Sequence, residues 1–159
     1  MKKLMLSMVI VMAVGMGGCA KETTVKTDSK PIIKQEVKEE KKQLMDIEEM
    51  GKGIILLETP SGDSSNGNVP FFFAVEDTLI MQIGYTGTDI AGDKITYAYI
   101  DGKLNSKNQM SEQCGGSIDL SEKALNVGVH IVEFIQYDTN KEDGKVVVYK
   151  VAKYEFKQQ

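Results

Sequence analysis

The chain has 159 residues, a formal net charge of −4, no arginine and no tryptophan. This length suits one small domain with appended segments. The lack of arginine and the net acidic charge argue against a nucleic-acid partner, because such sites favour the arginine fork on a basic surface.

The first eighteen residues predict a secretory signal peptide. Lys2 and Lys3 give a positive start, and an apolar run from Leu4 to Met16 follows without a charged residue. This run is about a dozen residues long, whereas a helix that spans a bilayer needs roughly 20. We therefore expect residues 1–18 to direct export and then to be removed, not to remain as a membrane span.

The end of this segment, Met16-Gly17-Gly18-Cys19, resembles the lipobox of bacterial lipoproteins, in which small residues precede a cysteine. Met16 stands where the lipobox usually has leucine. The resemblance implies cleavage between Gly18 and Cys19, and acyl chains on Cys19 that anchor the protein in the lipid bilayer. The alternative is an ordinary signal peptide that happens to end near a cysteine. The expected location is the extracytoplasmic face of the cell membrane, and the frequent use of Lys, Ile and Asn is common in Gram-positive bacteria.

Residues 19–50 are expected to form the lipidated cysteine and a charged tether. The segment is rich in Lys, Glu, Thr and Asp, and it cannot bury enough apolar surface to offset the entropy lost on ordering. Like charges four residues apart, as at Lys34 and Lys38, disfavour a helix. A short helical turn over Gln43–Met50 remains open, because its apolar residues share one face.

Residues 51–159 predict a single all-β domain. Short runs of apolar β-formers are separated there by Gly, Asn, Asp and Ser. Seven or eight short strands in this length fit a β-sandwich, with a small β-barrel as the alternative. The expected strands are Ile54–Glu58, Val69–Val75, Thr78–Tyr85, Lys94–Ile100, a weak one near Leu104–Met110, Gly116–Leu120, Val129–Tyr137 and Lys145–Phe156.

Four local features accompany these strands. Pro60–Asn68 is rich in Ser, Gly and Asn and predicts a loop. Asp101-Gly102 predicts a tight turn between two strands, and Ser121–Leu125 predicts one helical turn. In the last strand two apolar series of opposite parity meet at Val151-Ala152, which predicts a β-bulge there.

Two stretches resemble the immunoglobulin-like domains of bacterial surface proteins. Residues 95–103, ITYAYIDGK, resemble the strand in which a tyrosine leads into an Asp-Gly turn. Residues 125–138 resemble the strand that carries Leu, Gly and His, alternates apolar residues and closes with Asp. The chain departs from the family in having a long loop, Asn105–Gly116, between the two. The resemblance implies an immunoglobulin-like β-sandwich and says little about function, because one fold hosts many roles.

His130 is the only histidine of the chain. It shares a strand face with Val132 and Phe134, two residues before an inward position. A corner tyrosine occupies this position in immunoglobulin-like domains, where it bonds back to the backbone. We therefore expect a structural role. A metal or catalytic role would need partners, and Glu133 faces the opposite side of the strand.

Cys114 has no partner for an intramolecular disulfide once Cys19 is acylated. It is expected to lie in a loop over Ser111–Gly116. A tolerated free thiol is the main interpretation, and an intermolecular disulfide or a modified thiol is the alternative.

Residues 138–144, DTNKEDG, have the composition of a calcium-binding loop. Their glycine falls at the seventh position instead of the sixth, and the twelfth position is Tyr149 where calcium loops have an acid. We therefore expect a hairpin loop closed by Asp143-Gly144 and no metal ion.

Two apolar stripes suggest a surface for a partner. Phe71-Phe72-Phe73 is apolar on both strand faces, so that one face is left over after the core is formed. Ile131, Ile135 and Tyr137 form a second stripe, opposite the inward-facing Val132. These residues predict an exposed patch for a partner, with burial beneath long loops as the alternative.

The sequence therefore favours a membrane-anchored binding or accessory module at the cell envelope, whose partner is an envelope protein or a wall component. A protective lipoprotein of the exclusion or immunity type is the alternative. An enzyme is disfavoured, because the chain carries no motif that pairs a nucleophile with a base, no metal-ligand cluster and no phosphate loop. No cofactor is expected.

Overall fold

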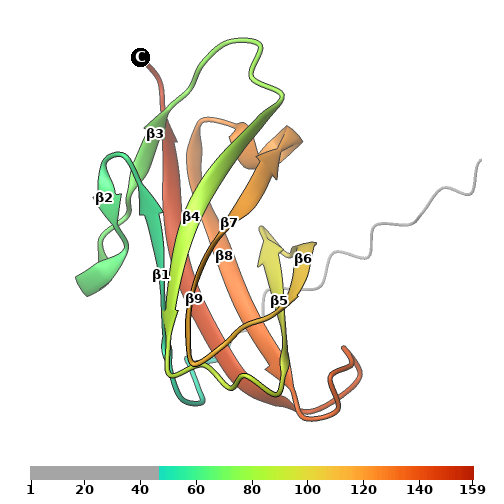
Figure 1. Cartoon of the computed structure of the whole chain (residues 1–159). Coiled ribbons are helices and arrows are strands. Elements are labelled where there is room, and N and C mark those ends of the chain that lie inside the picture. Colours follow the sequence, from blue (N-terminus) through green and yellow to red (C-terminus); the bar gives the residue numbers. More distant parts are fainter. Residues whose placement is uncertain (1–46) are drawn as a thin grey trace, which may run out of the picture. The chain divides into compact units, whose positions relative to one another are not determined.

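A computed structural model describes residues 47–159, which form a β-sandwich of two sheets (Figure 1). The four-stranded sheet has the order β2-β1-β4-β7, and the five-stranded sheet has the order β3-β9-β8-β5-β6. Within these residues no helix is long and apolar enough to cross a membrane. The strands are β1 (Ile54–Thr59), β2 (Gly62–Asp63), β3 (Phe71–Phe73), β4 (Ile80–Thr88), β5 (Ile95–Ile100), β6 (Lys103–Gln109), β7 (Gln113–Ser121), β8 (Gly128–Tyr137) and β9 (Val146–Lys157).

The strand order is that of an immunoglobulin-like sandwich, as the sequence predicts. β1-β4-β7 corresponds to strands A-B-E of that fold, and β5-β8-β9 corresponds to strands C-F-G. β3 pairs in parallel with β9, because the chain crosses from one sheet to the other after β2. β6 and β7 follow each other in the chain but are the edges of different sheets. The structure is therefore a sandwich and not the alternative barrel.

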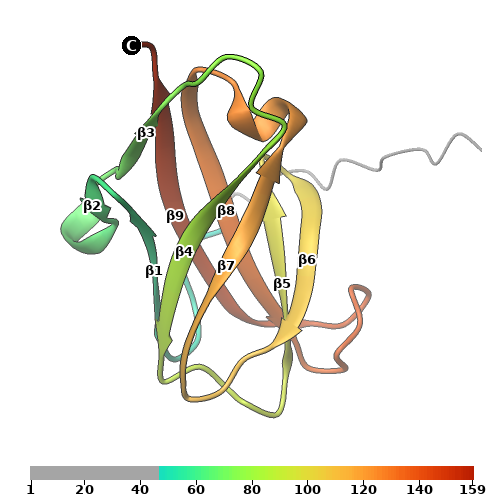
Figure 2. The same ribbon diagram turned by 45° about the horizontal axis from the view of Figure 1, so that its top comes forward.

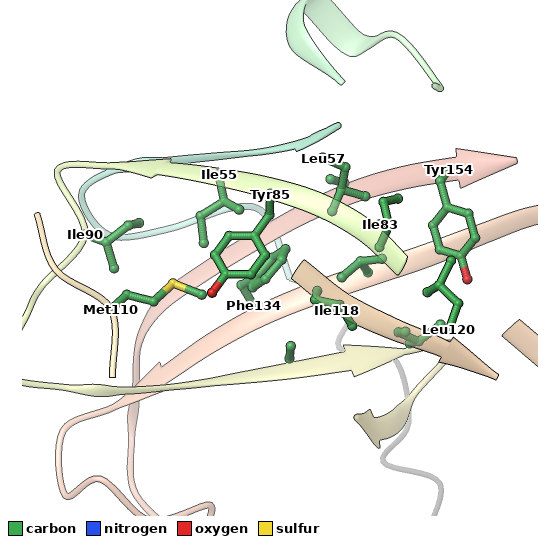
Figure 3. Packing of buried hydrophobic residues seen from close by; sticks show 14 of the residues in the cluster. Ile55, Leu57, Ile83, Tyr85, Ile90, Met110, Ile118, Leu120, Phe134 and Tyr154 are labelled. Carbon is green, nitrogen blue, oxygen red and sulfur yellow. The ribbon is translucent and has the colours of Figure 1, made fainter. Parts of the chain in front are cut away.

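Side chains from both sheets meet in one inter-sheet core. Leu57, Ile83 and Leu120 of the four-stranded sheet are fully buried, and Val132 and Phe134 of β8 lie on the facing sheet. Figure 3 shows the Tyr85 ring beside that of Phe134, and their centroids are 5.9 Å apart. This alternation of inward apolar residues is what makes the strands recognisable in the sequence.

The outer face of the five-stranded sheet carries a second buried group, which we call the tyrosine cluster. Its members come from β5, β8 and β9. The β8–β9 loop reaches over it, since the Tyr97 hydroxyl donates to the Asn140 carbonyl at 2.9 Å. At the edge of the same sheet, Met50 pairs with Tyr149 through two backbone hydrogen bonds of 3.0 Å. The central strands are therefore buried on both faces. The cluster consists of Tyr97, Tyr99, Ile135, Tyr137 and Tyr149.

The β-bulge predicted at Val151-Ala152 is absent, and burial of β9 on both faces explains the apolar pattern that suggested it. Pairing between β8 and β9 is unbroken there, since Glu133 faces Val151 and Val132 faces Ala152. The apolar residues of opposite parity serve two different faces, one in the inter-sheet core and one beside the tyrosine cluster. A register shift does occur in this pair of strands, but it lies at Gln136/Tyr137.

Three other expectations differ from the structure. The long loop predicted over Asn105–Gly116 is mostly strand, and only residues 110–112 connect β6 to β7. Residues 47–50 are not helical, and they bind the sheet although the sequence places them in the tether. Pro60–Asn68 contains the short strand β2 and a 3-10 turn, η1 (Ser65–Gly67). The rest of the predicted tether, the signal peptide, Gly18 and Cys19 lie outside the described residues.

Two turns agree with the sequence. Asp101 and Gly102 join β5 to β6 with φ values of 49° and 77°, the left-handed pair that a tight hairpin requires. The helical turn expected at Ser121–Leu125 is present as the 3-10 helix η2 (Glu122–Leu125). Both turns lie at the same end of the sandwich, and they shape the site described next.

Candidate functional site

Three connections meet at one end of the sandwich, which we call the η2 end. They are residues 74–79 between β3 and β4, the Asp101-Gly102 turn, and residues 122–127, which contain η2. β9 ends there as well, so the C-terminus lies at the η2 end (Figure 1). Figure 2 tilts the molecule so that this end comes toward the viewer.

His130 fastens these connections to the sheet. Its Nε2 donates to the carbonyl oxygen of Asn126 at 2.8 Å, four residues upstream, which is the backbone bond expected of a corner residue. Its Nδ1 lies 2.7 Å from Asp101 Oδ2, and the ring stacks on that of Tyr154 with centroids 5.0 Å apart. Because both ring nitrogens are engaged and the side chain is buried, His130 is not available as a general base.

Asp101 and Tyr154 extend this network. Asp101 Oδ1 accepts a hydrogen bond of 3.0 Å from the Ile131 amide, which ties the β5–β6 turn to β8. The Tyr154 hydroxyl donates to the Ala124 carbonyl at 2.9 Å, which ties η2 to β9. Burial, reinforced by the charge of Asp101, raises the pKa of Tyr154. The position of η2 is therefore set by hydrogen bonds to buried side chains.

A hollow of about 530 Å³ lies on the β5–β6 side of η2. Lys103 Nζ and Glu122 Oε2 approach to 3.3 Å, and both side chains are largely exposed, so this ion pair adds little stability. The lining contains side chains of both charges, asparagine side chains and no aromatic ring other than that of His130. It consists of Ile100, Asp101, Lys103, Leu104, Asn105, Ser121, Glu122, Lys123, Ala124, Asn126 and His130.

An apolar hollow of about 350 Å³ lies on the other side of η2, beneath the β3–β4 connection. Its floor is Phe156, which is buried and stacks on Phe72 with ring centroids 5.2 Å apart. Glu122 and Asn126 line both hollows, so η2 separates them. The lining consists of Ala74, Val75, Asp77, Thr78, Leu79, Met81, Glu122, Leu125, Asn126 and Phe156.

Several exposed apolar side chains lie at the η2 end. Leu79 is 82% exposed and Ile80 is 64% exposed, although the sequence places Leu79 within the predicted strand Thr78–Tyr85. β4 instead begins at Ile80, and Leu79 belongs to the connection. Six of the ten exposed large apolar residues in the described part of the chain lie at the η2 end. They are Phe73, Val75, Leu79, Ile80, Val127 and Val129, each more than half exposed.

The predicted partner stripe on β8 lies elsewhere and is mostly covered. Ile135 and Tyr137 are each 1% exposed, within the tyrosine cluster, and Ile131 is half-buried. This corrects the expectation of an exposed patch there and favours the alternative of burial. Part of the cover comes from the β8–β9 loop, whose Glu142 accepts a hydrogen bond of 2.9 Å from the Tyr99 hydroxyl.

Glu133 shares that outer face, opposite to His130, as the strand parity predicts. It is 3% exposed, and its Oε1 accepts a hydrogen bond of 2.7 Å from the Tyr149 hydroxyl. A buried carboxylate needs such a partner to offset its lost hydration. Glu133 therefore belongs to the packing of the tyrosine cluster and not to either hollow.

The Phe71–Phe73 stripe divides as its alternation predicts. Phe72 enters the core, while Phe71 and Phe73 lie on the outer face with their rings 5.5 Å apart. Lys157 Nζ lies 3.8 Å from the centroid of the Phe71 ring, and Phe73 is 51% exposed. Phe73 thus adjoins the η2 end, because β3 finishes there beside Lys157.

Cys114 and the acidic loop 138–144 do not contribute to the η2 end. Cys114 lies within β7 and not in a loop, half-buried beside Gly87. The acidic segment is the β8–β9 hairpin loop, in which Asp138 Oδ1 accepts from the Lys145 amide at 2.9 Å and the Gly144 amide donates to the Lys141 carbonyl. In residues 47–159 no three His, Cys, Asp or Glu side chains are grouped to hold a metal ion.

Comparisons with known proteins identify no family for this chain. No family model matches the sequence, and no curated protein matches it. Among solved structures, the chain is similar to one titled "Structures of Clostridium thermocellum CbhA fibronectin(III)-like modules", at 17% identity and a TM-score of 0.38. The match covers 69% of this chain and 48% of that one, so the chain spans about half of its length. The fold assignment rests on the strand order above.

Replacing His130 tests its part in holding the η2 end. His130→Ala removes the ring that stacks on Tyr154 and both hydrogen bonds, and it is expected to lower the free energy of unfolding by about 3 kcal/mol. Asn126→Ala is the matched control, because only the carbonyl of Asn126 serves His130; it should change stability by less than about 0.5 kcal/mol. Urea denaturation measures both. A loss below about 1 kcal/mol for His130→Ala would contradict this role.

The raised pKa of Tyr154 predicts that the folded protein becomes less stable in alkaline solution. Its pKa is raised in the folded protein above the ordinary value of 10.0, so its contribution is full below pH 10 and is lost as the pH rises further. In urea titrations above pH 10, the wild-type protein should lose up to about 1.4 kcal/mol more per pH unit than Tyr154→Phe. If the free energy of unfolding fell equally with pH in the two proteins, the buried Tyr154 hydroxyl would make no contribution to this pH dependence.

Proposed function

We propose that this chain is an extracytoplasmic lipoprotein of the cell envelope that binds a partner at the η2 end of its sandwich. The observation that carries this proposal is the concentration of exposed large apolar side chains at that end, namely Phe73, Val75, Leu79, Ile80, Val127 and Val129. Exposed apolar groups on one surface mark interaction sites in soluble domains.

The architecture of the η2 end supports binding more than catalysis. His130 uses both ring nitrogens to hold the corner, and Asp101 binds both His130 and the Ile131 amide. These groups are committed to positioning η2 and are not free to move protons. What the η2 end offers instead is a fixed apolar rim beside two hollows, which is the kind of surface that recognises another molecule.

The anchor is the second element of the proposal. The lipobox-like Met16-Gly17-Gly18-Cys19 supports acylation of Cys19 after cleavage at Gly18. One acyl chain gives marginal membrane binding, whereas two or more acyl chains give stable anchoring, at about 0.8 kcal/mol per buried CH₂. The binding end would then act outside the cell, on an envelope protein or a wall component.

Labelling with palmitate tests the anchor. Cells that express the full chain are expected to incorporate radioactive palmitate into the protein and to retain it in the membrane fraction. Cys19→Ser should abolish both the label and the retention, whereas Cys114→Ser, the control at the second cysteine, should change neither. Labelling that survives Cys19→Ser would disprove the proposed anchor.

Site-specific photo-crosslinking in intact cells tests the binding end. A benzoylphenylalanine at Leu79 should form one discrete adduct with an envelope component, because this side chain is 82% exposed and lines the apolar hollow. The same group at Lys141, exposed in the β8–β9 loop at the opposite end, is the control. Ile80→Ser should weaken the Leu79 adduct. Identical patterns from both positions would mean that the η2 end is not the binding surface.

A further inference from the structure

The apolar hollow combines an apolar floor with two carboxylates. The floor and walls are the buried Phe156 together with the half-buried Met81 and Leu125. Asp77 from the β3–β4 connection and Glu122 from η2 line the same hollow, and both are exposed residues. The hollow therefore offers a surface for an aliphatic chain and negative charge for the group at its end.

The negative charge at this hollow is not neutralised by the fold. Within residues 47–159 no ion pair involves Asp77, and the adjacent Glu76 is also exposed and without an ion pair. The pair of Glu122 with Lys103 spans 3.3 Å between side chains that are 75% and 49% exposed, so a competing cation would displace it at little cost. A cationic group of a partner would thus gain ion pairs without breaking a buried one.

We propose that the apolar hollow receives a lysine or arginine side chain from an apolar segment of a partner polypeptide. The aliphatic stem lies over Phe156 and Leu125, and the charged head reaches Asp77 and Glu122. The neighbouring Leu79, Ile80 and Val127 pack on the apolar residues that flank this side chain. This inference rests on the proposed function, and it defines the chemistry of the partner.

Charge complementarity favours this occupant over the two obvious others. A bilayer would have to accept Glu76 and Asp77, which stand between the apolar Val75 and Leu79, and anionic lipid headgroups would repel them. A two-fold contact between two copies of the chain would bring Glu76 and Asp77 of one copy close to the same residues of the other, and the like charges would repel. A basic, apolar polypeptide meets neither obstacle.

Selection from a displayed library of random dodecapeptides tests the inference. The full chain, held by its lipid end on detergent-coated beads, is the target. Selected peptides are expected to be enriched in Lys or Arg beside apolar residues. The Asp77→Asn, Glu122→Gln double variant should bind them about tenfold more weakly, because it removes the two charges that the cation meets. Asparagine tolerates the left-handed backbone of Asp77, where φ is 61°, so this exchange preserves the loop.

Asp143→Asn is the matched control, since it removes an exposed carboxylate at the opposite end and should change the affinity less than about twofold. No enrichment, enrichment without basic residues, or unchanged binding by the double variant would overturn the inference. So would stronger binding to anionic vesicles than to peptides, or self-association of the chain that Leu79→Ser abolishes.

These outcomes are separate from those of the proposed function. An adduct at Leu79 in cells, together with failure of the basic peptides, would leave the binding end in place and remove only the lysine or arginine occupant. Basic peptides that bind the hollow, together with absence of any adduct in cells, would retain the chemistry of the hollow and reject the η2 end as the working surface.

Discussion

The structure depends on the burial of the central strands of the five-stranded sheet on both faces. β5, β8 and β9 pack one face against the four-stranded sheet and hold the tyrosine cluster on the other. On this second face the β8–β9 loop is bound to the hydroxyls of Tyr97 and Tyr99. Because this face is buried within the domain, its apolar residues are not available to other molecules.

The η2 end is rigid because its connections are tied to buried side chains. His130 holds the chain before β8, Asp101 holds the β5–β6 turn, and Tyr154 holds η2. These bonds keep the two hollows open on either side of one short helix. A surface fixed in this way loses little conformational entropy when it binds another molecule.

Much of the fold could be predicted from the sequence, and the site could not. Strands with one buried face, such as β4, alternate visibly. β6 and β7 are edge strands with mostly exposed residues, so only a weak strand near Leu104–Met110 and a short one over Gly116–Leu120 were expected, with a long loop between them. Alternation does not distinguish a covered apolar face from an exposed one, which is why Ile135 and Tyr137 were assigned to a surface patch. The hollows join residues 74–79, 122–126 and Phe156, and no local pattern reports that these segments meet.

The attachment of residues 47–50 to β9 has a mechanical consequence. Tension that enters the domain from its N-terminal side reaches the sheet first at Met50, where two backbone hydrogen bonds of 3.0 Å join it to Tyr149, and at Glu49, which binds the Val151 amide at 2.8 Å. β9 is hydrogen-bonded along its length to β8, so the load passes into a strand that leads directly to the η2 end. If a molecule is bound at the η2 end while the N-terminal side is pulled, the force acts along the strands of the sandwich. In this direction many hydrogen bonds resist together.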